Sequence, residues 1–261
     1  MSQLLYSAAN TARSDLQYIP TPAPMGRFHQ PYPFARYVDD VEESLDRVGF
    51  EILAEEYEVT GDHQRLFGAM AIAPRSDARH YGEADPEYNL LLGLRGSHDQ
   101  SLQRELALGS QVMVCSNLCF SGNIGQFHSK QTKYLHRRLP GLISNTVARI
   151  PELAAAQDRK FDMYKDYQFS NPRAGDAALV EIFRQGGLSA AQLGKAVHEW
   201  DKPSYEEHTE YGRSAWQLLN AVTESLKPGG DRVNHSLIAQ RTEITDRFLS
   251  NLVGVEQRLA A

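Results

Sequence analysis

Hydrophobic and polar positions follow different patterns in the two halves of the chain. In the first half, short apolar runs lie between turn residues, which is typical of β-strands. The predicted strands cover 50–60, 65–73, 88–94 and 112–118, and a Gly61-Asp62-His63 turn joins the first two. The connections between the first three strands are too short for parallel crossovers, so we predict an antiparallel sheet.

Helical periodicity dominates the second half, where apolar residues recur every three or four positions. The predicted helices cover 141–167, 176–185, 189–200, 214–227 and 235–253. Pro151 either begins a new helix or kinks a long one, and Ser189 with Gln192 fits a capping box. A short amphipathic helix, 38–48, precedes the strands and ends at Gly49. The predicted fold class is α+β, with an antiparallel β-sheet region in the N-terminal half and a mainly helical C-terminal half.

The first 34 residues differ from the rest of the chain, because they contain five of the twelve prolines and little apolar periodicity. We predict an extended or disordered arm over 1–34. The alternative is an arm that docks on a neighbouring subunit through its aromatic residues Tyr6, Tyr18, Phe28, Tyr32 and Phe34. The sheet region, 35–127, and the helical region, 128–261, are expected to form one compact domain.

Composition excludes several classes of protein. Hydrophobic content is 41% and charged content is 23%, which is ordinary for a soluble domain. No apolar run approaches the ~20 residues that cross a bilayer, and no signal-peptide pattern begins the chain. Cys115 and Cys119 have no second ligand pair, and nucleotide-binding loops are absent. We therefore predict a cytoplasmic protein with free thiols, no membrane partner, no metal and no cofactor.

The charge distribution is the clearest functional signal. The net charge is −6, yet residues 106–151 contain no Asp or Glu and five Lys or Arg, which leaves −11 on the rest of the chain. An acid-free segment with interleaved aromatic residues can bind phosphates and stack on bases. The candidate nucleic-acid-binding residues are Lys130, Lys133, Tyr134, Arg137, Arg138 and Arg149. The alternative is a basic loop that pairs with the acidic remainder or with a neighbouring subunit.

The tripeptide Ser97-His98-Asp99 invites comparison with a hydrolytic triad. Triad members come from separated positions, because adjacent side chains point in different directions. We therefore expect a structural role, in which Asp99 caps a short helix over 100–108. A ligand or phosphate site and nucleophilic catalysis are the alternatives, and His98 and Asp99 are the candidate catalytic residues in the latter.

The stretch from Gly96 to Ser101, followed by 112–118, is similar to the paired signature of the DUF932 phage/plasmid-like family. That signature runs roughly Asn-Ser-His-Asp-Gly-Ser and then Arg-Val-Val-Cys-x-Asn. The matching residues are Ser97, His98, Asp99, Ser101, Cys115 and Asn117. Gln100 stands where the family has Gly, which weakens the expectation of a left-handed backbone at this turn. The helix 214–224, which contains Trp216, also resembles a family feature.

The resemblance implies a mobile element inside a bacterial cell, and the family offers no activity to carry over. We predict a non-enzymatic nucleic-acid-binding protein of DNA metabolism, acting through 126–149, with single-strand annealing as one option. The predicted partners are DNA, with single-stranded DNA as an option, and a second copy of the chain. One alternative is an interaction protein that counters a host defence protein. Another is a metal-dependent or hydrolytic enzyme centred on His98 and Asp99.

Overall fold

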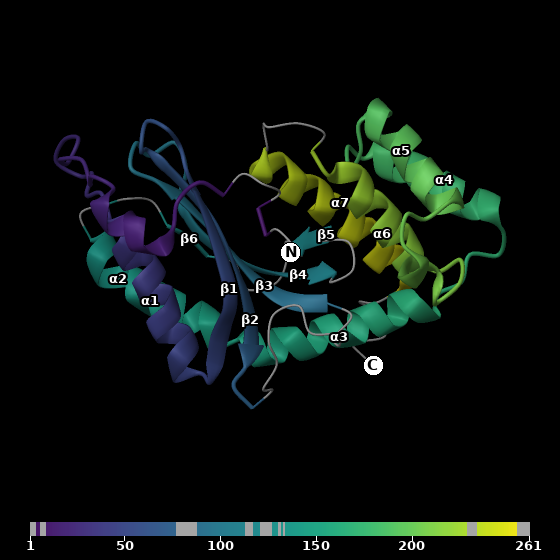
Figure 1. Cartoon of the computed structure of the whole chain (residues 1–261), viewed down its shortest axis with the longest axis horizontal. Coiled ribbons are helices and arrows are strands. Elements are labelled where there is room, and N and C mark those ends of the chain that lie inside the picture. Colours follow the sequence, from purple (N-terminus) through teal and green to yellow (C-terminus); the bar gives the residue numbers. More distant parts are fainter. Residues whose placement is uncertain are drawn as a thin grey trace. The chain divides into compact units, whose positions relative to one another are not determined.

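The computed structural model has the predicted α+β fold (Figure 1). The described residues are 4–5, 9–76, 88–112, 117–120, 127–129, 132, 134–228 and 234–254. The chain divides into two compact units. Unit 1 comprises 1–111 and 122–153, and unit 2 comprises 112–121 and 154–261. The units meet along the chain at 111/112, 121/122 and 153/154, whereas the predicted border between the sheet and helical regions is at 127/128.

Unit 1 is built on an antiparallel sheet, seen as the blue and teal arrows of Figure 1. Its strands are β1 (Phe50–Val59), β2 (Arg65–Pro74), β3 (Tyr88–Ser97), β4 (Arg104–Val112) and β6 (Phe127–Ser129). The order is β1-β2-β3-β4, and β6 pairs with β4. The β1–β2 hairpin is confirmed, and its turn places His63 at a φ of 58°.

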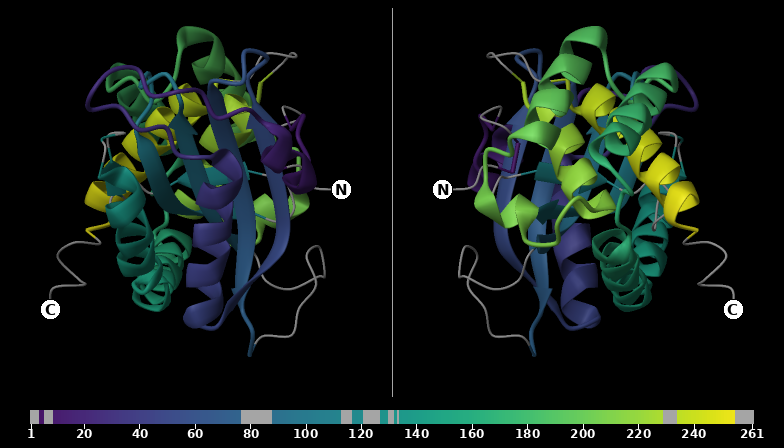
Figure 2. Two further views of the ribbon diagram at one scale, coloured as in Figure 1. Left: turned by 90° about the vertical axis from the view of Figure 1, so that its left-hand side faces the viewer. Right: turned by 90° about the vertical axis from the view of Figure 1, so that its right-hand side faces the viewer.

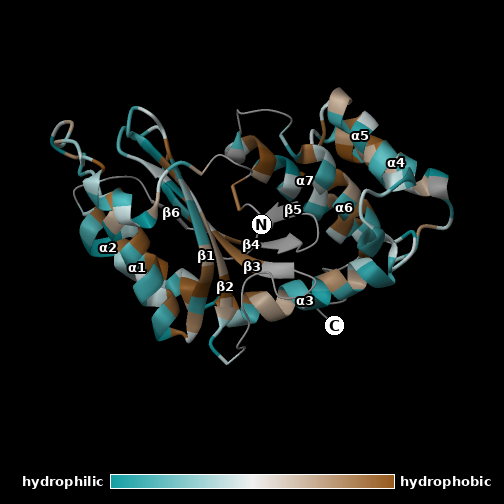
Figure 3. Cartoon of the chain, in the orientation of Figure 1, coloured by the Kyte–Doolittle hydropathy of each residue, from teal (hydrophilic) through white to brown (hydrophobic). Residues whose placement is uncertain are grey.

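Two helices, α1 (Phe34–Arg47) and α2 (Leu135–Val147), cover one face of this sheet (Figures 1 and 2). In α2, Leu135, Leu139 and Ile143 lie four residues apart and are all buried. Figure 3 shows hydrophobic and hydrophilic positions alternating along α1, as expected of an amphipathic helix. Gly49 follows α1 with a φ of 81°, which agrees with its predicted role as a helix terminator.

The N-terminal arm is more ordered than the proline-rich sequence suggests. It contains a 3₁₀-helix, η1 (Arg13–Tyr18), and Thr11 forms a β-bridge with Tyr57 of β1. Leu16 is buried in the core of unit 1, so apolar burial holds the segment in place. Of the five aromatic anchors, Tyr32 and Phe34 are buried, Tyr18 and Phe28 are exposed, and Tyr6 lies outside the described residues.

Unit 2 is mainly helical (green and yellow in Figure 2, right). Its elements are β5 (Asn117–Phe120), most of α3 (Ile150–Asp166), α4 (Pro172–Arg184), α5 (Ala190–Asp201), η2 (Glu206–Thr209), α6 (Ala215–Leu226) and α7 (His235–Val253). Nearly every residue of α6 is buried, and its Trp216 packs edge-on against Phe161 at 4.8 Å. The capping box of Ser189 and Gln192 is confirmed at the start of α5.

The break near Pro151 follows one of the two predicted alternatives. Helix α2 ends at Val147 and α3 begins at Ile150, so Pro151 lies in the first turn of a new helix. Proline is tolerated at this place, because the amides of the first turn have no partner within the helix.

One predicted element is wrong. The helix expected over 100–108 is replaced by strand β4, in which Arg104, Leu106 and Leu108 are buried and the residues between them are partly exposed. This period of two belongs to a strand, and pairing with β3 and β6 outweighs the helix propensity of Arg, Glu, Leu and Ala. In the predicted strand 112–118, Val112 is the end of β4, Asn117 and Leu118 belong to β5, and 113–116 lie outside the described residues.

Candidate nucleic-acid interface

The turn that carries the Ser-His-Asp tripeptide is closed by its own side chains. Ser97 Oγ accepts from the Leu102 amide at 2.9 Å and donates to the Leu102 carbonyl at 3.1 Å. Asp99 Oδ1 accepts from the Ser101 amide at 2.9 Å, so Asp99 caps this turn and not a helix. Gln100 has a φ of 67°, which shows that the left-handed backbone is present although Gly is not. The hydrogen bonds of Ser97 and Asp99 therefore stabilise a turn in which a non-glycine residue has a left-handed backbone.

His98 is enclosed within unit 1. Its side chain is fully buried, and its ring stacks on Phe34 with ring centroids 3.9 Å apart. Its Nε2 lies 3.1 Å from the Tyr32 carbonyl oxygen, which requires the tautomer that carries a proton on Nε2. Burial, followed by the charge of Arg104, lowers the pKa of His98 to about 4. The ring is thus neutral at pH 7 and holds the backbone of the arm.

Arg104 is a second buried residue that binds the same carbonyl, and sequence reasoning missed it. Its Nη2 donates to the Tyr32 oxygen at 2.6 Å, and its guanidinium lies 4.8 Å from the Phe34 ring and 5.2 Å from the Tyr37 ring. Burial lowers the pKa of Arg104 to about 10, so the side chain stays charged at neutral pH. A Cβ at Gly96 would lie 2.5 Å from Arg104 Cδ, so only glycine leaves room for it.

These contacts bring the arm to the chain around Thr132, in the basic segment 130–134 that precedes α2. Tyr32, whose carbonyl is held by His98 and Arg104, lies three residues after His29, which forms a β-bridge with Thr132. The backbone of Arg104 also pairs with Ser129 of β6, just before the basic segment. The signature turn therefore has an architectural role. His98 and Arg104 hold the arm at Tyr32, and β6, which precedes the basic segment, pairs with the strand that carries Arg104.

The predicted nucleic-acid-binding residues do not all come together. Tyr134 is the residue before α2 and is 52% exposed, and Arg137 and Arg138 are exposed in the first turn of that helix. Arg149 lies beyond the other end of α2, which at 13 residues is about 20 Å long. Lys130 and Lys133 lie outside the described residues, as does the signature residue Cys115, and Asn117 begins β5.

The start of α2 has an unusual charge for a helix N-terminus. Its first turn contains no acidic residue, and the residue before it makes no side-chain capping hydrogen bond. The same turn exposes His136, Arg137 and Arg138. The amides of Leu135, Arg137 and Arg138 donate to the carbonyls of Thr132 and Tyr134, and the helix dipole makes this end positive. Cations are therefore unfavourable there and anions are favoured.

Apart from the buried Arg104, the described arginines of unit 1 fall into two groups. In the first group, each side chain lies within ion-pair distance of at least one carboxylate; its members are Arg13, Arg36, Arg47, Arg65, Arg75 and Arg95. In the second group, no ion pair to a described acidic residue forms; its members are Arg27, Arg137, Arg138 and Arg149. Three of these four lie close along the chain to the His29–Thr132 bridge.

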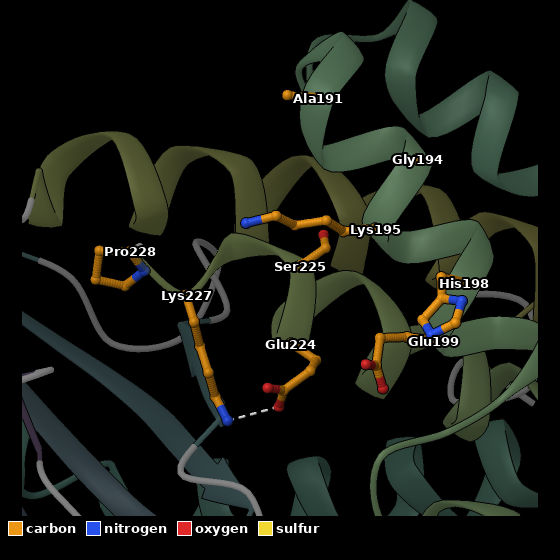
Figure 4. A pocket seen from close by; sticks show the side chains of 9 residues that line it. All are labelled: Ala191, Gly194, Lys195, His198, Glu199, Glu224, Ser225, Lys227 and Pro228. Carbon is orange, nitrogen blue, oxygen red and sulfur yellow. Dashed lines mark ion pairs between the residues drawn. The ribbon is translucent and has the colours of Figure 1, made fainter. Parts of the chain in front are cut away.

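Unit 2 contains a cleft of about 600 Å³ between α5 and the end of α6, lined by His198, two lysines and two glutamates among others (Figure 4). Lys227 is ion-paired with Glu224 at 2.5 Å. Glu199 accepts from the amide and hydroxyl of Ser204 at 2.9 and 2.6 Å. Because these contacts engage both carboxylates, the cleft does not define a reaction.

No group of three or more His, Cys, Asp or Glu side chains suited to a metal ion occurs within the described ranges. None of the helices described is both long enough and apolar enough to span a membrane.

Comparison with known proteins adds no relative. No family model, curated protein or solved structure matches the chain. The resemblance of the signature turn to the DUF932 family stays a prediction.

Proposed function

We propose that the protein binds nucleic acid through the start of α2 and the basic segment before it. The residues proposed to make this surface are Lys130, Lys133, Tyr134, Arg137 and Arg138, with Arg149 as a separate contact further along. The observation that carries the proposal is the pair of exposed arginines in the first turn of α2, which have no carboxylate partner among the described residues.

The cost of placing cations at this end of a helix supports the proposal. Each cation beside a helix N-terminus is unfavourable by about 0.3–1 kcal/mol. Arg137 and Arg138 are not needed for the core, because α2 buries Leu135, Leu139 and Ile143 on its other side. A phosphate bound there would interact favourably with both guanidinium groups and with the positive end of the helix dipole.

The resemblance supports the biological setting that we propose. It suggests a cytoplasmic protein of a bacterial mobile element, working in DNA metabolism without catalysis, with single-strand annealing and self-association as options. The enclosure of His98 argues in the same direction, since a general base must reach its substrate.

Binding is tested by fluorescence anisotropy with labelled single-stranded and duplex DNA at 50 and 200 mM salt. The variant Arg137→Ala/Arg138→Ala should bind at least tenfold more weakly at the lower salt concentration. The slope of log K against log salt should decrease by about 1.4 to 1.8, the share of two phosphate contacts.

The matched control is Arg159→Ala/Arg173→Ala, which removes two exposed arginines of unit 2. Arg173 is a strict control, because it too lies in the first turn of a helix, but that turn is capped by Asn171. The control should bind as the wild type does. Equal affinities for wild type and Arg137→Ala/Arg138→Ala would refute the proposed surface.

A further inference from the structure

We infer that the arm completes this surface and that its ligand is a single-stranded nucleic acid, whose bases stack on Phe28 and Tyr134. The inference rests on the proposed function and specifies which form of nucleic acid the surface takes. It adds Arg27 and Phe28, which lie about 100 residues away in sequence from α2, to the binding residues.

A single β-bridge brings the two aromatic residues to one end of unit 1. His29 pairs with Thr132, and Phe28 immediately precedes His29 while Tyr134 lies two residues after Thr132. His29 is 4% exposed, and its Nδ1 accepts from the Met25 amide at 2.9 Å, which closes the tip of the arm into a turn. In Figure 1 the purple loop of the arm lies at the end of the unit where α1 and α2 begin.

Exposed apolar area gathers at this bridge. Within the described part of unit 1, four large hydrophobic side chains are exposed. Three of them, Met25 at 55%, Phe28 at 65% and Tyr134 at 52%, flank the bridge, and only Tyr18 lies elsewhere in the arm. Buried aromatic side chains are the rule where a core is available, so a cluster on the surface indicates a binding surface.

Cations lie close along the chain to both aromatic residues. The guanidinium of Arg27 lies 5.5 Å from the Phe28 ring, and the first turn of α2 supplies Arg137 and Arg138. Aromatic faces that alternate with phosphate-binding cations are the pattern of single-strand binding proteins. In a duplex the bases already stack on one another, so side-chain rings reach them only in a single strand.

The arm is held in position before any ligand arrives. His98 and Arg104 bind the Tyr32 carbonyl from inside the unit, and the bridge to Thr132 fixes the arm at a second point. A surface that is already ordered loses less conformational entropy when it binds. Phe28 is therefore presented by a supported turn and not by a free tail.

The inference is tested by anisotropy with three labelled probes: a 20-nucleotide thymidine strand, the matching uridine strand and a 20-base-pair duplex. Wild type should bind at least one of the single strands tenfold or more tightly than the duplex. Phe28→Ala/Tyr134→Ala should lose about tenfold or more for the single strand, with an unchanged salt slope and a smaller loss for the duplex. Phe28→Trp should retain single-strand affinity, because indole also stacks on bases.

Tyr18→Ala is the matched control, since Tyr18 is 77% exposed in the same arm but away from the bridge, and it should have no effect. Thermal unfolding of each variant confirms that it is folded. Equal binding of single strand and duplex, or full affinity in Phe28→Ala/Tyr134→Ala, would overturn the stacking inference. If binding still depended on salt in that case, the proposed function would stand. Failure to bind any of the three probes would overturn both.

Discussion

Two regions of unit 1 use arginine in opposite ways. Around η1, Arg13 lies within ion-pair distance of Asp39 and Glu42 of α1 and Glu55 of β1. Around the His29–Thr132 bridge, Arg27, Arg137 and Arg138 have no described carboxylate partner. The same side chain therefore joins secondary-structure elements in one region and faces solvent in the other. The difference indicates which cations are available to a ligand, which a count of charges along the sequence does not.

His98 and Arg104 form a buried scaffold that holds the Tyr32 carbonyl of the arm. It keeps the arm against the sheet, so that paired residues can fasten one part of the arm while another part is presented to solvent. We therefore make separate predictions for scaffold, paired and unpaired residues. The expected effects on folding stability decrease in that order.

Removal of the Arg104 side chain should have the largest effect on folding. Arg104→Ala leaves a cavity beneath Phe34 and Tyr37 and removes one of two donors to Tyr32, so the free energy of unfolding should fall by about 2–4 kcal/mol. Urea unfolding measures this loss. Arg104→Met keeps most of the volume and removes the buried charge, so its loss should be smaller. A loss below about 1 kcal/mol for Arg104→Ala would show that the scaffold does not depend on it.

The pH dependence of stability should report His98. Its folded pKa of about 4 lies below the usual value of 6.5, so the unfolded chain binds more protons between these values. Stability from the neutral ring is complete above pH 6.5 and decreases as the pH falls towards 4, by on the order of 2–3 kcal/mol.

Comparison of wild type with His98→Gln isolates this contribution, because glutamine can donate to Tyr32 but does not titrate. Burial also lowers the pKa of His208, which acts in the same direction in both proteins. The unfolding free energy of His98→Gln should therefore vary less with pH over this window. Identical pH dependence in the two proteins would contradict an enclosed, neutral His98.

Arg13 should matter for stability and not for binding. Arg13→Ala leaves a cluster of three carboxylates without their cation, and we expect a loss of about 1 kcal/mol in urea unfolding with unchanged nucleic-acid affinity. A tenfold loss of affinity in this variant would remove the distinction between paired and unpaired regions.

Arg137→Ala should have the smallest effect on folding stability, and unlike the other substitutions it should stabilise the protein. Removing a cation from an uncapped helix N-terminus should raise the free energy of unfolding by about 0.3–1 kcal/mol. Differential urea unfolding at low salt resolves a change of this size, and Arg149→Ala at the other end of α2 provides the control. Destabilisation by Arg137→Ala would mean that the side chain has a structural role.

Much of the fold could be predicted from local patterns. The β1–β2 hairpin, the termination of α1 at Gly49 and the capping box at Ser189 each depend on residues close in sequence. Strand β4 could not be predicted in this way, because Arg, Glu, Leu and Ala all favour helix and only pairing with β3 and β6 makes them extended.

The candidate site was predictable in part. The absence of acids over 106–151 led directly to Tyr134, Arg137 and Arg138. The position of Phe28 near Tyr134 was not predictable, because a bridge between His29 and Thr132 joins residues with no local relation. Arg104 left one signal, a charged residue in phase with Leu106 and Leu108, which can be interpreted only once the segment is known to be a strand.

The most direct test of the account is the salt dependence of single-strand binding in two variants, Arg137→Ala/Arg138→Ala and Arg13→Ala. The account predicts that the first variant lowers both the affinity and the slope of log K against log salt, by about 1.4 for two phosphate contacts on a single strand. It predicts that Arg13→Ala leaves both quantities at the wild-type value. Equal slopes in wild type and Arg137→Ala/Arg138→Ala would contradict the claim that the unpaired arginines bind phosphate.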